Sequence, residues 1–190
     1  MKNQPETTEL LDKISLQTKR AVEIMRDFSN FSKQSIDENY RESISIKSVL
    51  ESVLPLLRYE AETRAIKISC EIPDNLSCVE TDRRGLEQVM FNLIINACQA
   101  MKVPGGKILI TAYELDQKRM RLIVSDDGPG IDAEKQKKIF KSFYTTKEEG
   151  TGLGLYITKQ LVERNDGTIT VESEEGKGAQ FIIELPKARM

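Results

Sequence analysis

The sequence contains no histidine and no tryptophan, and aromatic residues make up only 6% of its 190 residues. Without histidine, catalysis by a Ser-His-Asp or Cys-His arrangement is excluded. A zinc site would depend on carboxylates and on three scattered cysteines that form no CxxC pair, Cys70, Cys78 and Cys98. We interpret these cysteines as reduced structural thiols, the ordinary state inside cells.

Long apolar runs and a strong charge of one sign are also missing. No stretch approaches the ~20 apolar residues of a membrane span, and the first residues, "MKNQPETTELL", lack the apolar core of a signal peptide. The net charge of −2 provides no broad basic field for nucleic acid or an anionic membrane. We therefore expect a cytoplasmic segment that contacts neither nucleic acid nor membrane, and a longer protein would be free to carry a membrane anchor elsewhere.

Residues 9–32 carry a stripe of mostly apolar positions at alternating steps of four and three. The stripe consists of Leu10, Ile14, Gln17, Ala21, Ile24, Phe28 and Phe31. This spacing predicts a bundle or coiled-coil helix, which needs partner helices, most simply from a second copy of the chain. A polar stretch over residues 33–43 follows. We assign residues 1–36 to the bundle helix, 37–44 to a linker and 45–190 to a second domain.

The second domain alternates predicted helices and strands. Residues 119–126 follow residues 107–115 so closely that we expect a hairpin. The expected helices cover 45–64, 82–101 with Asp82 as N-cap, a short piece after residue 131, and 152–164; the other strands cover 66–72, 77–80, 167–173 and 179–186. This order predicts an α/β sandwich with helices on one face of a mixed sheet.

Two asparagines share a side of the expected helix 82–101. Gln88, Asn92, Asn96 and Gln99 form a polar arc beside the apolar one. One exposed Asn is ordinary, but two at i and i+4, with no charged residue between Phe91 and Met101, favour a function. A carboxamide oxygen suits a hard cation such as Mg²⁺ and adds no negative charge beside a polyphosphate.

Two glycine-containing stretches complete the pattern. In "DDGPGI", Asp126 ends an expected strand where its carboxylate could accept from an exocyclic amine, although such turns are common. "GTGLGL" opens the expected helix 152–164, and bare N–H groups at a helix start suit phosphate. It is neither a GxGxxG motif nor a Walker A motif.

The order and spacing of these stretches resemble the ATP-binding domain of two-component sensor histidine kinases. "NLIINA" resembles the family's N box, "DDGPGI" its G1 box, Phe140 and Phe143 its F box, and "GTGLGL" its G2 box. The resemblance covers residues 45–186 and is strongest to the nitrogen-regulator type, from "FYTTKEEGTGLGL". It implies the two-layer Bergerat ATP-binding fold of the GHKL superfamily, preceded by a bundle helix, with ATP and Mg²⁺ as cofactors.

The resemblance also implies roles for individual residues. Asn96 would coordinate Mg²⁺, and Asp126 would accept from the adenine amino group, with Gly128, Gly130 and Ile131 lining the base. Asn92 beside the phosphates and Lys147 at the terminal phosphates would take part in transfer. The residues implied to wrap the triphosphate are Gly150, Thr151, Gly152, Leu153 and Gly154.

The bundle helix resembles the second helix of the family's dimerisation and histidine-phosphotransfer domain. The implied activity is transfer of the ATP γ-phosphate to a histidine, followed by relay to an aspartate of a response-regulator receiver domain. Because the chain has no histidine, it would not phosphorylate itself. We expect a fragment that begins after the acceptor helix and forms a homodimer when the full bundle is present; the alternative is a natural protein without that helix.

Some residues depart from the family's pattern. Gln99 stands where many relatives have lysine, and "RNDGTI" lacks the common His-Gly-Gly. Two other functions stay open: an ATPase of the gyrase, Hsp90 and mismatch-repair type, and a non-catalytic nucleotide-binding regulator. The ATPases carry a glutamate as general base one turn before the metal Asn, where this chain has Asn92.

Overall fold

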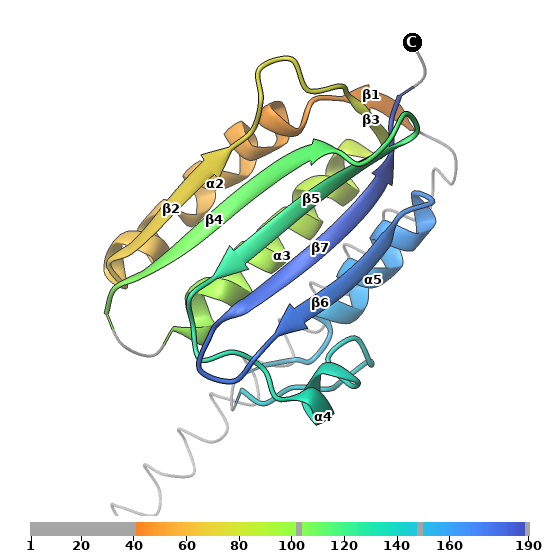
Figure 1. Cartoon of the computed structure of the whole chain (residues 1–190). Helices are drawn as coiled ribbons and strands as arrows, with labels where there is room; N and C mark the ends of the chain where they lie inside the picture. The colour runs from red at the N-terminus through yellow and green to blue at the C-terminus, as the bar shows by residue number, and fades with distance from the viewer. Residues whose placement is uncertain (1–40, 102–103, 148–149, 189–190) are drawn as a thin grey trace, which may run out of the picture.

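The computed structural model describes residues 41–101, 104–147 and 150–188, which form helices packed on one face of a sheet (Figure 1). The elements are β1 (Glu42–Ile44), α2 (Ile46–Thr63), β2 (Ile66–Glu71), β3 (Val79–Thr81), α3 (Arg83–Ala100), β4 (Gly106–Glu114), β5 (Arg119–Asp126), α4 (Ala133–Gln136), α5 (Gly154–Arg164), β6 (Thr168–Ser173) and β7 (Ala179–Pro186). None of the helices in these ranges is long and apolar enough to cross a membrane.

The main sheet has five strands in the order β2-β4-β5-β7-β6. β2 runs parallel to β4 and the other neighbours are antiparallel, so the sheet is mixed, and the expected β4–β5 hairpin is present. Helices α2, α3 and α5 cover one face, with α3 in contact with both of the others (Figure 1). The predicted two-layer α/β sandwich is confirmed.

The core lies between this helical layer and the sheet. Alternate residues of the central strands are buried, as Ile108, Ile110 and Ala112 are in β4. Leu93 and Ile94 of α3 are fully buried. The other sheet face carries polar pairs such as Arg121 with Glu184, whose Nη2 and Oε1 atoms are 2.6 Å apart. One buried face and one partly polar face explain the alternating pattern of the strands.

Helix α3 is fixed at its start by two side chains. The Asp82 carboxylate accepts hydrogen bonds from the backbone N–H groups of Arg84 and Gly85, at 3.1 and 3.0 Å. The Asp82 N–H donates to Oδ1 of buried Asn165, at 3.0 Å. The predicted N-cap is therefore confirmed, and Asn165, which departs from the family pattern, anchors the same helix end.

Part of the predicted linker is folded. Residues 42–44 form β1, which pairs antiparallel with β3, and Ile44 is only 1% exposed. The assignment of all of residues 37–44 to a linker was therefore wrong, because a strand of three residues is too short to show a period in a polar stretch. The predicted bundle helix over residues 1–36 and the first part of the linker lie outside the described residues.

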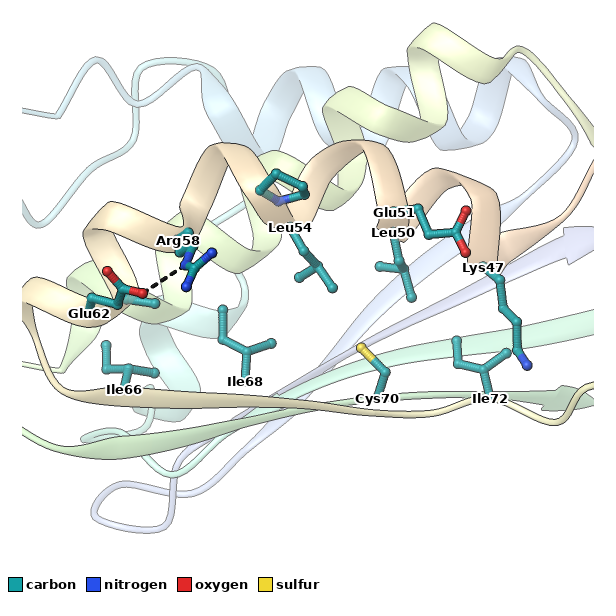
Figure 2. Close-up of a pocket in the computed structure, with 12 residues that line it drawn as sticks. Lys47, Leu50, Glu51, Leu54, Arg58, Glu62, Ile66, Ile68, Cys70 and Ile72 are labelled. Carbon is teal, nitrogen blue, oxygen red and sulfur yellow. Dashed lines mark hydrogen bonds and ion pairs between the residues drawn. The ribbon is translucent and has the colours of Figure 1, made fainter.

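A cavity of about 750 Å³ lies between α2 and β2, at the edge of the sheet (Figure 2). Apolar side chains such as Leu54 and Ile68 line it, and the ion pair of Arg58 with Glu62 stands at its rim. None of the predicted nucleotide-binding residues lines this cavity. The cavity is therefore separate from the predicted nucleotide site.

Candidate functional site

The two asparagines of α3 are half-buried, beside the fully buried face of the helix. The Asn92 side-chain Nδ2 donates to the carbonyl oxygen of Gly154 at 3.2 Å and to Oγ1 of buried Thr158 at 3.3 Å. Both partners belong to α5. Asn92 therefore joins the "NLIINA" stretch to the start of the helix that "GTGLGL" opens.

Asn96 contacts a cationic side chain. The Lys147 ammonium donates to Asn96 Oδ1 at 2.8 Å and to Gln99 Oε1 at 2.7 Å. Burial lowers the pKa of Lys147, and the nearby positive charge of Arg64 lowers it further. Since two carboxamide oxygens at the end of α3 hold an ammonium, their chemistry suits a cation, and magnesium at Asn96 stays a prediction.

Asp126 ends β5 as predicted. Its Oδ1 accepts from the Gly128 N–H at 2.9 Å. Burial raises the pKa of the Asp126 carboxyl, hydrogen bonds from the backbone N–H groups of Gly128 and Ala179 act in the opposite direction, and the charge of Asp127 adds to the rise. A half-buried carboxylate with acceptor capacity to spare fits a ligand that donates an N–H.

The loop after Asp126 rests on the β6–β7 turn. Ser173 Oγ accepts from the Ile131 N–H at 2.8 Å, and Gln136 Nε2 donates to the carbonyl oxygens of Ile131 and Ser173 at 2.6 and 2.8 Å. At Gly130, with φ +71°, an added Cβ would lie 2.1 Å from the Glu174 carbonyl oxygen. Sequence reasoning missed Ser173 and Gln136, which belong to no motif and act across the fold.

The "GTGLGL" stretch combines one closely packed glycine with one open glycine. Gly152 has φ +69°, and a Cβ there would lie 2.4 Å from the backbone of Phe143. Gly154 has no neighbouring atom within 4 Å of its would-be Cβ, and the side chain of the N-cap residue, Leu153, makes no capping hydrogen bond; Thr151 Oγ1 accepts from the Leu153 N–H at 3.3 Å. A helix start that its N-cap side chain does not cover, beside open space, suits an anion such as phosphate.

The two phenylalanines of the predicted F box have different surroundings. The Phe140 ring packs edge-on against Phe181, with centroids 6.4 Å apart. Phe143 is 68% exposed and has φ +61°. Phe140 therefore contributes to the core, whereas Phe143 lies on the surface next to the glycine stretch.

The predicted site residues gather at one end of the molecule. Asn92 contacts Gly154, and Asn96 contacts Lys147, across 62 and 51 positions of sequence. The loop after β5, α4 and the segment that leads into α5 lie together at the end of the sheet where β5 ends (Figure 1). Among the described residues, no direct hydrogen bond joins Asp126 to Asn92, Asn96 or Lys147.

Comparison with known proteins identifies this arrangement. Residues 81–189 match the family of histidine kinase-, DNA gyrase B- and HSP90-like ATPases. The chain is a member of this ATPase family. The predicted membership of the GHKL superfamily and the predicted ATP-binding fold are therefore confirmed.

Relatives of this ATPase domain are sensor kinases. Sporulation kinase E of Bacillus subtilis (strain 168) is 34% identical over 174 residues, which cover 91% of this chain and 23% of that kinase. The catalytic domain of histidine kinase ThkA matches with a TM-score of 0.70 at 33% identity, covering 78% of this chain and 97% of that one. Full-length ShkA in complex with AMPPNP matches with a TM-score of 0.78 at 26% identity, covering 100% of this chain and 40% of ShkA.

These matches favour the histidine kinase branch of the ATPase family over the gyrase and chaperone branches, as predicted. The chain spans 23% to 31% of the length of the curated relatives compared. It corresponds to their catalytic ATPase domain, which supports ATP as the ligand. The roles of the individual site residues stay predictions.

Proposed function

We propose that this domain binds Mg·ATP at the end of α3 and transfers the γ-phosphate to a histidine that another protein segment supplies. The observation that carries the proposal is the pair of contacts made by α3, from Asn92 to Gly154 and from Asn96 to Lys147. They bring an amide pair, a lysine and an open helix start together. Phosphoryl transfer needs such positioning and charge neutralisation more than covalent chemistry from the protein.

Each part of the nucleotide has proposed partners. The adenine lies against Asp126, Gly128, Gly130 and Ile131. Asn96 holds Mg²⁺, which neutralises phosphate charge when bound. The phosphates lie against Asn92, Lys147, Gly150, Thr151, Gly152, Leu153 and Gly154. The remaining acceptor capacity of the half-buried Asp126 carboxylate and the open space at Gly154 support the adenine end and the phosphate end of this placement.

Transfer to a protein side chain is favoured over hydrolysis. Asn92 stands where the related ATPases have a glutamate, and a carboxamide cannot take a proton from water. Its Nδ2 donates to the Gly154 carbonyl oxygen and to Thr158, so it positions α5 against α3. The domain therefore lacks the general base that the hydrolytic branch uses at this position.

The partners follow from the sensor-kinase relatives. We infer a response-regulator receiver domain as the final phosphate acceptor and a homodimer formed through residues 1–36 within the full helical bundle. The protein would act in the cytoplasm, where response regulators are found. The relatives' own names support a kinase role.

Radiolabelled ATP tests the transfer. We expect the chain, with Mg²⁺ and ATP labelled at the γ-phosphate, to label the histidine of a sensor-kinase dimerisation domain whose own ATP site is disabled. The Asn96→Asp variant should lose at least tenfold in rate, because a new carboxylate repels the phosphates. Acid-labile label on the acceptor supports the proposal; label released only as free phosphate, at a rate that Asn96→Asp abolishes, would favour an ATPase instead.

A further inference from the structure

Gln99 makes a contact that the proposed function does not use. It lies exposed on the last turn of α3, three residues after Asn96, and its Oε1 accepts from the Lys147 ammonium at 2.7 Å. Lys147 lies 48 positions further along the chain, in the segment before α5. The carboxamides of Asn96 and Gln99 therefore both accept hydrogen bonds from the Lys147 ammonium, and these bonds connect the segment before α5 to α3.

The ammonium and a magnesium ion would compete for Asn96. The Lys147 Nζ is 2.8 Å from Asn96 Oδ1, the oxygen proposed to bind the metal. A divalent cation on the same oxygen would lie within about 5 Å of the ammonium, and two positive charges at that distance repel each other strongly where water is partly excluded. Lys147 and Mg²⁺ therefore exclude each other at this position.

We propose that Gln99 is a positioning residue that, with Asn96, holds the Lys147 ammonium at the end of α3, and that Lys147 leaves this position when Mg²⁺ and nucleotide bind. The inference rests on the proposed function. Gln99 thereby sets the resting position of the segment before α5. Because only the released form binds metal, the apparent affinity for Mg·nucleotide is lowered by the fraction of molecules in which Lys147 is held.

The backbone N–H and carbonyl groups of Lys147 each take part in a hydrogen bond while its ammonium is held. The Lys147 N–H donates to Thr145 Oγ1 at 3.1 Å, and the Gly150 N–H donates to the Lys147 carbonyl oxygen at 3.3 Å. A Cβ on Gly150 would lie 2.4 Å from Thr145 Oγ1, so Gly150 lies close against Thr145. Release of the ammonium should therefore expose the Lys147 and Gly150 amides to exchange with solvent.

Calorimetric titration with AMPPNP tests the competition. The Gln99→Leu variant should bind AMPPNP about three- to tenfold more tightly in Mg²⁺, because one charged hydrogen bond no longer opposes release. Without Mg²⁺, in EDTA, the gain should be smaller. In a Lys147→Met background the Gln99→Leu change should have no effect, since the partner is absent. Gln117→Leu, at an exposed glutamine in the turn at the far end of the β4–β5 hairpin, is the matched control.

Hydrogen exchange without nucleotide supplies a second readout. The Lys147 and Gly150 amides should exchange faster in Gln99→Leu and in Gln99→Lys, which places a second ammonium beside the first. Gln99→Glu keeps an acceptor and should keep the slow exchange. Equal exchange in all four proteins would overturn the inference.

The two proposals fail in different ways. If the parent chain binds AMPPNP and Gln99→Leu binds with unchanged or weaker affinity, the positioning role of Gln99 is wrong and the nucleotide site stands. An equal gain in the Lys147→Met background would also overturn the positioning role. If neither the parent nor any variant binds AMPPNP, the proposed function is overturned and this inference with it.

Discussion

Asp126 is placed where binding and stability make opposite demands. The proposed role needs an ionised carboxylate to accept from adenine, yet burial raises the pKa of this group and so disfavours the ionised form. A carboxyl with a raised pKa stabilises the folded state below its unfolded pKa of about 3.9, and that stability is lost as the pH rises through the folded value. At neutral pH the folded protein therefore bears the full cost of the buried charge.

The Asp126→Asn variant should separate these two demands. Without nucleotide at pH 7 it should melt at a higher temperature than the parent, because the buried charge is gone. This advantage should shrink as the pH falls through the raised pKa of Asp126 and disappear once both side chains are neutral. Thermal unfolding across this pH range, with and without Mg·AMPPNP, measures both effects.

Binding should change in the opposite direction. Asp126→Asn should lose most of the rise in melting temperature that Mg·AMPPNP produces in the parent, since an amide replaces the carboxylate. Asp127→Asn, at the exposed neighbouring position, should keep that rise and is the matched control. A variant that binds as the parent does, or one that melts lower at pH 7, would contradict the account of Asp126.

At the residue scale, local rules predicted the polar arc of α3 but not its partners. The period of a helix placed Asn92 and Asn96 on one side, and the structure has both half-buried there. Gln99 shared the predicted arc, but its contact depends on where Lys147 lies, in a segment without apolar periodicity. Ser173 and Gln136 were missed for the same reason, since the hydrogen bonds of Ser173 with Ile131 and of Gln136 with Ser173 join distant parts of the sequence.

At the scale of elements, two glycines stand where the chain enters α5, and glycine is required at each position for a different physical reason. Gly152 needs a positive φ and lies against the Phe143 backbone, whereas Gly154 faces open space. A side chain at position 152 would disturb the fold. A side chain at position 154 would fill space that we assign to the phosphates.

The paired variants Gly152→Ala and Gly154→Ala should therefore fail in different assays. Gly152→Ala should lower the free energy of unfolding by about 1–2 kcal/mol or more, through left-handed strain and the backbone clash. Gly154→Ala should change stability by about 1 kcal/mol at most, in either direction, yet weaken AMPPNP binding at least tenfold. Urea unfolding and calorimetry measure the two quantities. Equal binding by Gly154→Ala and the parent would place the phosphates elsewhere.

Element boundaries were predictable where a side chain acts locally. Asp82 bonds backbone groups two and three residues ahead, so its role as N-cap follows from sequence. Strand β1 was missed because its three residues gain stability only from pairing with β3, which follows it by more than thirty positions. The order of the expected helices and strands predicted the two-layer sandwich, whereas no local pattern determines the strand order β2-β4-β5-β7-β6.

At the scale of the whole molecule, two regions compete as places where a ligand would bind. One is the end of the sheet where Asp126, Asn96 and the start of α5 gather. The other is the apolar cavity of about 750 Å³ between α2 and β2 (Figure 2). Its lining is mostly apolar and its Arg58 is paired with Glu62, so it offers few groups for a polyphosphate. The chemistry of the lining residues therefore favours the end of the sheet as the nucleotide site.

Hydrogen–deuterium exchange of the full chain, with and without Mg·AMPPNP, tests the central claim most directly. We predict slower exchange in the nucleotide complex at residues 128–131, at residues 150–156 and at the last turn of α3, with α2 and β2 unchanged. Protection confined to α2 and β2, or no protection anywhere at saturating nucleotide, would contradict the account of this protein as a Mg·ATP-binding kinase domain.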